Sequence, residues 1–310
     1  SGKFRQYGWS AMSKKIKRVR ELIDSIKAHS PMSPTPQNSD FSILELGRLA
    51  AEPDGFLVLH ALVEAYKEAK PAGGNTTLKA CLEAIHIAAT HNATLSPIMD
   101  FLLSLIAEGN REYALIAAVT RASINSQSSR QVRELLSYDD DDVRHTARDA
   151  VREAAVDGRP IEFLIPTIVK LLGSSDSAAA LLAATALLHA ARSGQDITRA
   201  LVPLVRAVSR RDKRIAARAA AALTYLKGHK VSLKPHITTM VKMLGGWSQE
   251  AEKAVIIEAL RRYSARGKTA SREVLKAMKL VAGIERRAQT RDFMNELEKR
   301  AAPKSSTRRR

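Results

Sequence analysis

The chain repeats itself every 36 residues between Asp140 and Leu244, and this period limits its possible folds more than any other feature. Aspartates 36 residues apart mark each copy, at Asp140, Asp176 and Asp212. Eight apolar columns keep the same spacing: Val143/Ala179/Ile215, Ala147/Ala183/Ala219, Ala150/Ala186/Ala222, Val151/Leu187/Leu223, Ile165/Leu201/Ile237, Ile168/Leu204/Met240, Val169/Val205/Val241 and Leu172/Val208/Leu244. A period of this length is typical of structural repeats that stack on their neighbours and share one continuous core.

The columns lie on helices. In the second helix of each copy, four core positions follow one another at steps of four, three and one residues, which is one face of an α-helix. Two of these four positions are alanine in every copy between 143 and 223, so neighbouring helices can approach closely. Aromatic residues make up only 5% of the chain, and Gly and Pro are few, which favours packed helices over strands.

Helical segments alternate with short turns along nearly the whole chain. Apolar spacing predicts them at 13–28, 41–51, 54–69, 76–91, 95–108, 111–125, 128–137, 141–156, 160–173, 177–192, 197–209, 212–227, 232–245, 249–264, 270–282 and 285–301. Gly, Pro, Asn and Asp mark the turns between them. We therefore expect an all-α protein.

One motif of the repeat is similar to the sequence signature of a known family. The stretch FLIPTIVKLL carries Pro166, and DDVRHTARDAV carries Asp142, Val143 and Arg144 before its spaced alanines. A proline in the first helix, an aspartate at the turn and Val-Arg in the second helix resemble the HEAT-repeat family. The resemblance implies a right-handed α-solenoid of about seven to eight antiparallel helix pairs, clearest over residues 75–282.

The ends of the chain differ from this array. We expect residues 1–12 to be a leader or disordered start, 13–302 to form a single solenoid, and 303–310 to be a basic, disordered tail. A loop at 29–39 follows the first helix. In it Ser30, Ser33 and Thr35 each precede a proline, as in the sites of proline-directed kinases, although a plain connecting loop is the simpler interpretation.

The positive charge is large and unevenly distributed. The chain has a formal net charge of +18, and residues 143–310 alone carry +19, against +6 for residues 1–39 and −7 for residues 40–142. A basic half of this kind favours polyanions: nucleic acid, an anionic membrane or an acidic protein surface. No apolar run is long enough for a membrane span, so we expect nucleic acid or an acidic protein as the partner.

The sequence offers little for catalysis or metal binding. Cys81 is the only cysteine, which excludes an intrachain disulfide and favours an intracellular location, cytoplasmic or nuclear. His86 and His91 are five residues apart and so do not share a helix face. The acidic run 139–142 lacks the alternating ligands of a calcium loop, and no glycine-rich phosphate loop or nucleophile motif occurs. We therefore expect no metal, no cofactor and no catalytic residue.

The candidate binding residues are cations. The densest cluster lies at a turn and the start of a second helix, where positive charges oppose the helix dipole and favour an external anion. With other cations expected to be exposed on second helices, the predicted polyanion-binding residues are Arg148, Arg152, Arg210, Arg211, Lys213, Arg214, Arg218, Lys253, Arg261 and Arg262. A second, regular row comprises Lys170, Arg206, Lys242 and Lys279, although these could simply keep the surface hydrated.

Three functions fit these features. The first is a non-enzymatic scaffold whose basic half binds the backbone of duplex DNA or structured RNA. The second is a protein-interaction scaffold for an acidic or helical partner, which is the commonest use of HEAT-like repeats. The third is an alkylpurine DNA glycosylase, since such enzymes are built from HEAT-like repeats, but these need Trp or Tyr and an acidic residue grouped in the groove. Trp9 and Trp247 are the only tryptophans.

Overall fold

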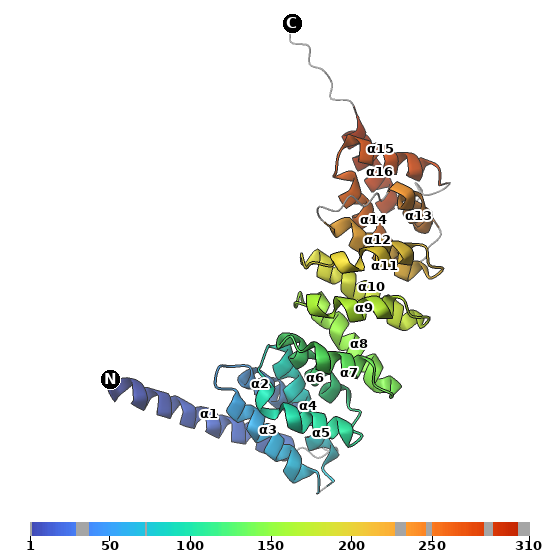
Figure 1. Ribbon diagram of the computed structural model, residues 1–310. Coiled ribbons are helices and arrows are strands. Elements are labelled where there is room, and N and C mark those ends of the chain that lie inside the picture. Colours follow the sequence, from blue (N-terminus) through green and yellow to red (C-terminus); the bar gives the residue numbers. More distant parts are fainter. Residues whose placement is uncertain are drawn as a thin grey trace. The chain divides into compact units, whose positions relative to one another are not determined.

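The computed structural model describes residues 2–28, 37–71, 73–226, 234–245, 250–281 and 288–302, and in this part the chain is all-helical with no strand (Figure 1). Three features discussed above lie outside the described residues: loop residues 29–36 with their Ser-Pro and Thr-Pro steps, Trp247, and segment 303–310. The fold class predicted from the sequence, all-α, is confirmed.

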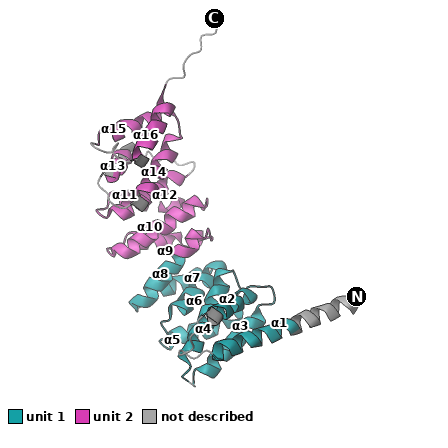
Figure 2. Ribbon diagram, turned by 180° about the vertical axis from the view of Figure 1, so that it is seen from behind, with its two compact units in different colours: residues 1–151 teal, residues 152–310 magenta. Residues whose placement is uncertain are grey.

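The chain divides into two compact units, Ser1–Val151 and Arg152–Arg310, which we call unit 1 and unit 2 (Figure 2). The helices that begin in unit 1 are α1 (Gly2–Ala28), α2 (Gln37–Ala50), α3 (Phe56–Ala69), α4 (Asn75–Thr90), α5 (Met99–Ala107), α6 (Tyr113–Asn125), α7 (Ser129–Leu136) and α8 (Asp141–Val156). The boundary between the units falls inside α8. The single array over 13–302 stays a prediction.

Unit 2 continues with α9 (Ile165–Leu172), α10 (Ser177–Arg192), α11 (Leu201–Val208), α12 (Lys213–Tyr225), α13 (Lys234–Gly245), α14 (Glu250–Ser264), α15 (Lys268–Lys279) and α16 (Ala288–Ala301). Neighbours in sequence pack as pairs: α9 with α10, α11 with α12, α13 with α14 and α15 with α16. Across the pairs, α12 packs against both α10 and α14. In unit 1, α4 is central and contacts α2, α3 and α6.

Each expected helical segment is present, but several ends differ. Helix α1 begins at Gly2 rather than near residue 13, and α2 begins at Gln37, inside the loop predicted over 29–39. The first helices α5, α9 and α11 are shorter than predicted because each is preceded by a 3-10 turn, at Ser96–Ile98, Glu162–Leu164 and Thr198–Ala200. Pro97 lies in one such turn and Pro166 in the first turn of α9, where the missing N–H of proline costs no helical hydrogen bond.

Most of the repeated apolar columns are buried, although Val169, Leu201 and Val205 on the first helices are only half-buried. In α8, α10 and α12 the second-helix positions of all three copies are at most 1% exposed, among them Ala147, Ala183 and Ala219 at 0%. The same pattern continues in α14, where Ile256, Ala259 and Leu260 are also buried. The side chain of Glu252, which interrupts the pattern, lies outside the described residues.

The repeated aspartates are helix N-caps. The Oδ1 atom of Asp140 accepts hydrogen bonds from the backbone N–H groups of Asp142 (2.9 Å) and Val143 (3.2 Å), and Asp176 accepts equivalent bonds from Ala178 and Ala179. Asp212 accepts one from the Arg214 N–H at 2.9 Å. These bonds satisfy amide groups that have no partner inside the helix. The period therefore specifies where each second helix starts as well as which face it buries.

Gly47 marks the closest approach of two helices in unit 1. A Cβ atom at this position of α2 would lie 2.5 Å from Cγ2 of Ile87 on α4 and 2.9 Å from the carbonyl oxygen of Ala84. Real Cβ contacts are not this short, so a side chain here would push α2 away from α4. Inside a helix, alanine is normally more stable than glycine by about 1 kcal/mol. The presence of glycine at position 47 is therefore explained by the close packing of α2 on α4.

Substituting Gly47→Ala is expected to lower the stability of unit 1 by about 1–3 kcal/mol, the usual cost of overpacking. Thermal unfolding followed by circular dichroism measures this as a fall in the transition midpoint. Gly173→Ala is the control, because its nearest contact would be 3.4 Å from the Lys170 carbonyl and its backbone is right-handed. A Gly47→Ala protein at least as stable as the wild type would contradict the packing argument.

Candidate polyanion-binding surface

The whole net charge of the chain resides in unit 2. Residues 152–310 contain 32 Lys and Arg against 14 Asp and Glu, whereas residues 1–151 contain 18 of each. Unit 1 is therefore neutral overall, and unit 2 carries +18. The division of the fold into units coincides with a division of charge, which directs the search for a polyanion site to unit 2.

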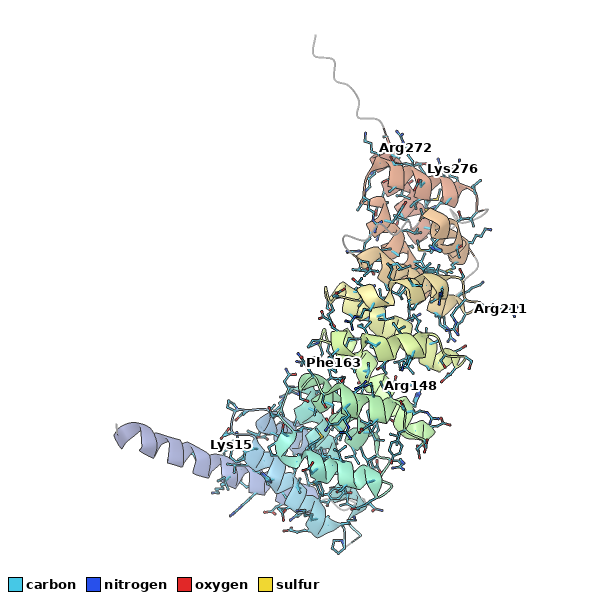
Figure 3. The ribbon with its side chains drawn as sticks, viewed as in Figure 1. Lys15, Arg148, Phe163, Arg211, Arg272 and Lys276 are labelled. Carbon is cyan, nitrogen blue, oxygen red and sulfur yellow. The ribbon has the colours of Figure 1, made fainter. Side chains whose placement is uncertain are left out.

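In unit 1, the basic helix α1 is matched by acidic neighbours. Arg18 pairs with Glu45 on α2 at 2.7 Å, and Lys27 pairs with Glu68 on α3 at 2.6 Å. Lys15, labelled in Figure 3, bonds to Glu52 and Asp54 in the turn between α2 and α3. The positive N-terminal helix thus neutralises the acidic region that follows it in sequence.

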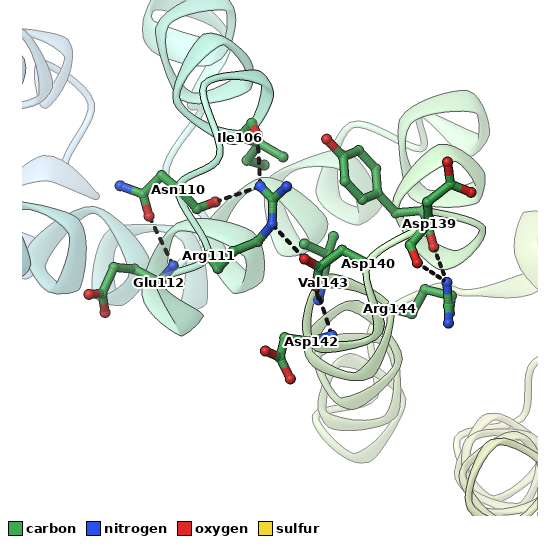
Figure 4. A network of polar contacts seen from close by, with 10 residues as sticks. Ile106, Asn110, Arg111, Glu112, Asp139, Asp140, Asp142, Val143 and Arg144 are labelled. Atoms are coloured by element: carbon green, nitrogen blue, oxygen red, sulfur yellow. Dashed lines mark hydrogen bonds and ion pairs between the residues drawn. The ribbon is translucent and has the colours of Figure 1, made fainter.

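A second ionic contact in unit 1 joins two successive turns (Figure 4). The Nε atom of Arg111 donates to Oδ2 of Asp140 at 3.0 Å, and its Nη1 donates to the carbonyl of Ile106 at 2.9 Å. The bond from Arg111 holds the pKa of Asp140 below its ordinary value. Arg144 donates to the carbonyls of Tyr138 and Asp139 and pairs with Asp141. These arginines are engaged in the fold of unit 1.

The two sets of cations that the sequence separates meet at one edge of unit 2. Lys170 and Arg206 lie in the last turns of the first helices α9 and α11, and the Arg210–Arg218 cluster begins in the turn where α11 leads into α12. We call this the turn edge of unit 2, defined by Lys170, Arg206, Arg210, Arg211, Lys213 and Arg214. Cations in the last turn of a helix complement its dipole, so Lys170 and Arg206 are locally favourable.

Arg210 holds the turn edge together. Its guanidinium crosses to the end of the preceding helix pair, where Nη1 donates to the carbonyl of Leu172 at 2.6 Å and Nη2 donates to that of Ser174 at 2.7 Å. Carbonyls at the end of a helix lack partners within it, and a charged donor makes the stronger kind of hydrogen bond. Arg210 therefore caps α9 and joins two successive turns.

Arg214 is also occupied. It pairs with Asp212 at 3.2 Å, while the same carboxylate caps α12. Burial opposes the ionisation of Asp212, but the hydrogen bonds from the Arg214 side chain and backbone outweigh it and keep its pKa below the ordinary value. This pair accounts for part of the positive charge gathered at the start of the helix.

The remaining cations of the turn edge are free to bind. Lys170, Arg206, Arg211 and Lys213 are all exposed, and none of them has a carboxylate partner in the part of the chain that the structure describes. Figure 3 shows Arg211 pointing outward at the margin of the molecule. Of the other two members of the row, Lys242 is exposed in the last turn of α13, and Lys279 at the end of α15 pairs with Glu298 at 2.9 Å.

The cations on the second helices of unit 2 have more hydrogen-bonding and ion-pair partners than those of the turn edge. Arg152 lies 3.5 Å from Glu153, and Arg261 pairs with Glu296 at 2.9 Å. Arg218 donates to the carbonyl of Arg214 at 3.3 Å. Arg148, on α8, is half-buried and belongs to unit 1.

Lys253 corrects an expectation. The sequence predicted an exposed cation on α14, but Lys253 is only 6% exposed. The register explains this, because Lys253 follows Ala216 by 37 residues and Ala180 by 73, and both alanines are 0% exposed. Lys253 therefore occupies an inner position of the repeat and is not placed to bind a polyanion.

A cluster on the second helices was missed by the sequence analysis. Arg192 on α10 and the hydroxyl of Tyr225 on α12 both bond to Glu258 on α14, and the guanidinium of Arg262 lies 3.7 Å from the centre of the Tyr225 ring. Glu153, His189, Tyr225 and Arg262 follow the repeat at intervals of 36, 36 and 37 residues. Extending the period to polar positions would have found this column.

His189, the member of this column on α10, lies among several positive side chains. Burial and the nearby charges of Arg192, Arg218 and Arg152 lower the pKa of His189, and Glu258 offsets them only in part. The described residues contain no group of three or more potential metal ligands, and none of their helices is long and apolar enough to cross a membrane. Cys81 is buried, which raises its pKa to about 12.

Fold and site together define an all-α protein with a basic, repeat-containing unit. No protein-family model matches the chain, and no curated protein does. Among solved structures, the crystal structure of an engineered protein is similar, with a TM-score of 0.32 and 18% sequence identity, over 86% of this chain and 97% of the other.

Replacing Arg210 with alanine is expected to lower stability by about 1–3 kcal/mol, because it leaves the carbonyls at the end of α9 without their charged donor. Arg211→Ala, which changes the adjacent side chain, is expected to leave the unfolding midpoint within experimental error. Thermal denaturation of both variants measures the difference. Equal effects of the two substitutions would show that Arg210 has no capping role.

Proposed function

We propose that the chain is a non-enzymatic scaffold, built as a HEAT-like α-solenoid, whose unit 2 binds the phosphate backbone of a nucleic acid. The main support for this proposal is the turn edge. There Lys170, Arg206, Arg211 and Lys213 are exposed without a carboxylate partner in the described residues. Because stacked helices lie about 8–10 Å apart, cations on successive turns form a row rather than a single point. A row of cations suits the regular negative charge of a nucleic-acid backbone.

Three of the aromatic residues described in unit 2 are already engaged or buried, which favours a backbone-binding mode over base stacking; Phe163 is half-buried. Tyr225 is engaged with Arg262 and Glu258, and Tyr263 is buried and donates its hydroxyl to Glu273 at 2.8 Å. Phe293 is fully buried. Proteins that bind single strands usually present aromatic rings on which bases stack. We therefore favour duplex DNA or structured RNA as the ligand, bound without sequence preference.

A salt titration tests this proposal. Binding of the full chain to a short labelled DNA duplex is expected to weaken steeply with salt, and each turn-edge contact that is lost is expected to reduce the log–log slope by about 1. Variants Arg211→Ala and Lys213→Ala should each show this loss. Arg199→Ala is the matched control, because Arg199 is an exposed cation of unit 2 in the 3-10 turn before α11, at the opposite end of that helix.

The result that overturns the proposal is binding that does not respond to salt, or no binding at low salt. A loss of affinity that is equal in the Arg199 and Arg211 variants would assign binding to overall charge instead of the turn edge. Retention of a protein partner after nuclease treatment would favour the alternative, a scaffold for an acidic or helical protein. That alternative is supported by the mixed charges around Tyr225, since such clusters also suit protein partners.

The enzymatic alternative rests on a different observation. Tyr225 and Glu258 bring an aromatic ring and a carboxylate together on the second helices, as a base-releasing glycosylase requires. However, Glu258 is already bonded to both Arg192 and Tyr225, so it is not free to act on a substrate. Release of bases from alkylated DNA by the full chain, abolished in Glu258→Gln, would establish the enzymatic function instead.

A further inference from the structure

Unit 1 contains a groove along the first half of α4. Two hollows of about 660 and 600 Å³ adjoin there and share Asn75, Lys79, Leu82 and Glu112. One extends toward α3 and the turn between α5 and α6, and the other toward α1 and α2. We call this continuous depression the α4 groove; the buried side chain of Leu82 lines both hollows, and that of Ile26 lines the one at the α2 end.

The two ends of the groove differ in charge. At the α3 end, Lys70 pairs with Glu108 at 2.7 Å, and where the two hollows adjoin, Lys79 pairs with Glu112 at 3.3 Å. At the α2 end, Asp40 and Glu83 line the groove, and neither has a lysine or arginine partner in the described part of the chain. His86 lies 4.0 Å from Glu83, and Lys79, which also lines this hollow, is paired with Glu112.

Glu83 presents its carboxylate to the groove with 49% of the side chain exposed. Partial burial raises its pKa. A cation placed beside it would restore the lost stabilisation. The exposed ring of Tyr113 and the apolar side chain of Ile43 border the same hollow, so a ligand there meets both apolar surface and negative charge.

We propose that the α2 end of the α4 groove binds the basic segment 303–310 of a second copy of the chain. This segment, PKSSTRRR, carries four cations and no carboxylate in eight residues. The rest of unit 2 carries +14 and repels this segment, whereas the neutral unit 1 offers Asp40 and Glu83 in the groove. Charge complementarity therefore selects unit 1 as its binding site.

The lengths are compatible. The groove follows α4 from Asn75 to Glu83, a rise of about 12 Å at 1.5 Å per residue. An extended chain spans at most about 3.3–3.6 Å per residue, so four residues cover this distance. The three consecutive arginines 308–310 can thus reach Asp40 and Glu83 while the preceding residues follow the groove.

The test is direct binding of a fluorescently labelled synthetic peptide, PKSSTRRR, to the full chain, measured by anisotropy. We expect saturable binding, weakened at least fivefold in the double variant Asp40→Asn/Glu83→Gln. Glu134→Gln is the matched control, because Glu134 is an exposed carboxylate of unit 1 on α7, outside the groove. Circular dichroism of each variant confirms that the fold is retained. A peptide with its basic residues replaced by serine should not bind.

Failure of this proposal is separable from failure of the proposed nucleic-acid function. The turn-edge variants Arg211→Ala and Lys213→Ala should leave peptide binding unchanged, and Asp40→Asn/Glu83→Gln should leave duplex binding unchanged. Absence of peptide binding, or equal binding by wild type and the double variant, overturns the groove proposal. An equal loss in the Glu134 variant also overturns it, because binding would then depend on the general charge of unit 1.

Discussion

The close packing of alanine-bearing second helices is the constraint on which the rest of unit 2 depends. Ala183 and Ala219 are fully buried where α10 packs against α12, and larger side chains there would separate the helices. This contact fixes the spacing of successive helix pairs and hence of their turns. Arg210 can bond to the carbonyls of Leu172 and Ser174 only because the turns lie close together. Helix packing therefore sets the positions of the turns, and the cations on those turns make the turn edge basic.

Much of this structure could be predicted from the sequence. Helix positions, the buried columns and the all-α class follow from periodicity, because each repeat places the same residue types in the same environment. The role of Arg210 could not be predicted, because its partners are backbone carbonyls, which every residue has whatever its side chain. The burial of Lys253 was missed for another reason: its charge was given more weight than its register, although the corresponding Ala180 and Ala216 already indicated an inner position.

The candidate site shows why counting charges is not sufficient. Of the ten cations first chosen, Arg210, Arg214 and Arg261 each make a specific contact within unit 2, and Lys253 is buried. Arg211 and Lys213 stay available, together with Lys170 and Arg206 from the regular row. The partners of Arg210 and Arg261 lie 35 to 38 residues away in sequence, whereas Arg214 pairs with Asp212 in its own turn. The sequence alone showed only how the net charge is distributed between the two halves of the chain.

The concentration of charge in one unit also affects how the chain resists unfolding. Like charges repel, so the +18 of unit 2 opposes its own compact state, whereas unit 1 carries no such excess. If unit 2 binds a polyanion as proposed, the ligand would relieve this repulsion and stabilise the folded form, with a gain that rises with the logarithm of the ligand concentration. Unit 1 would gain nothing by this route and would rely on its own packing.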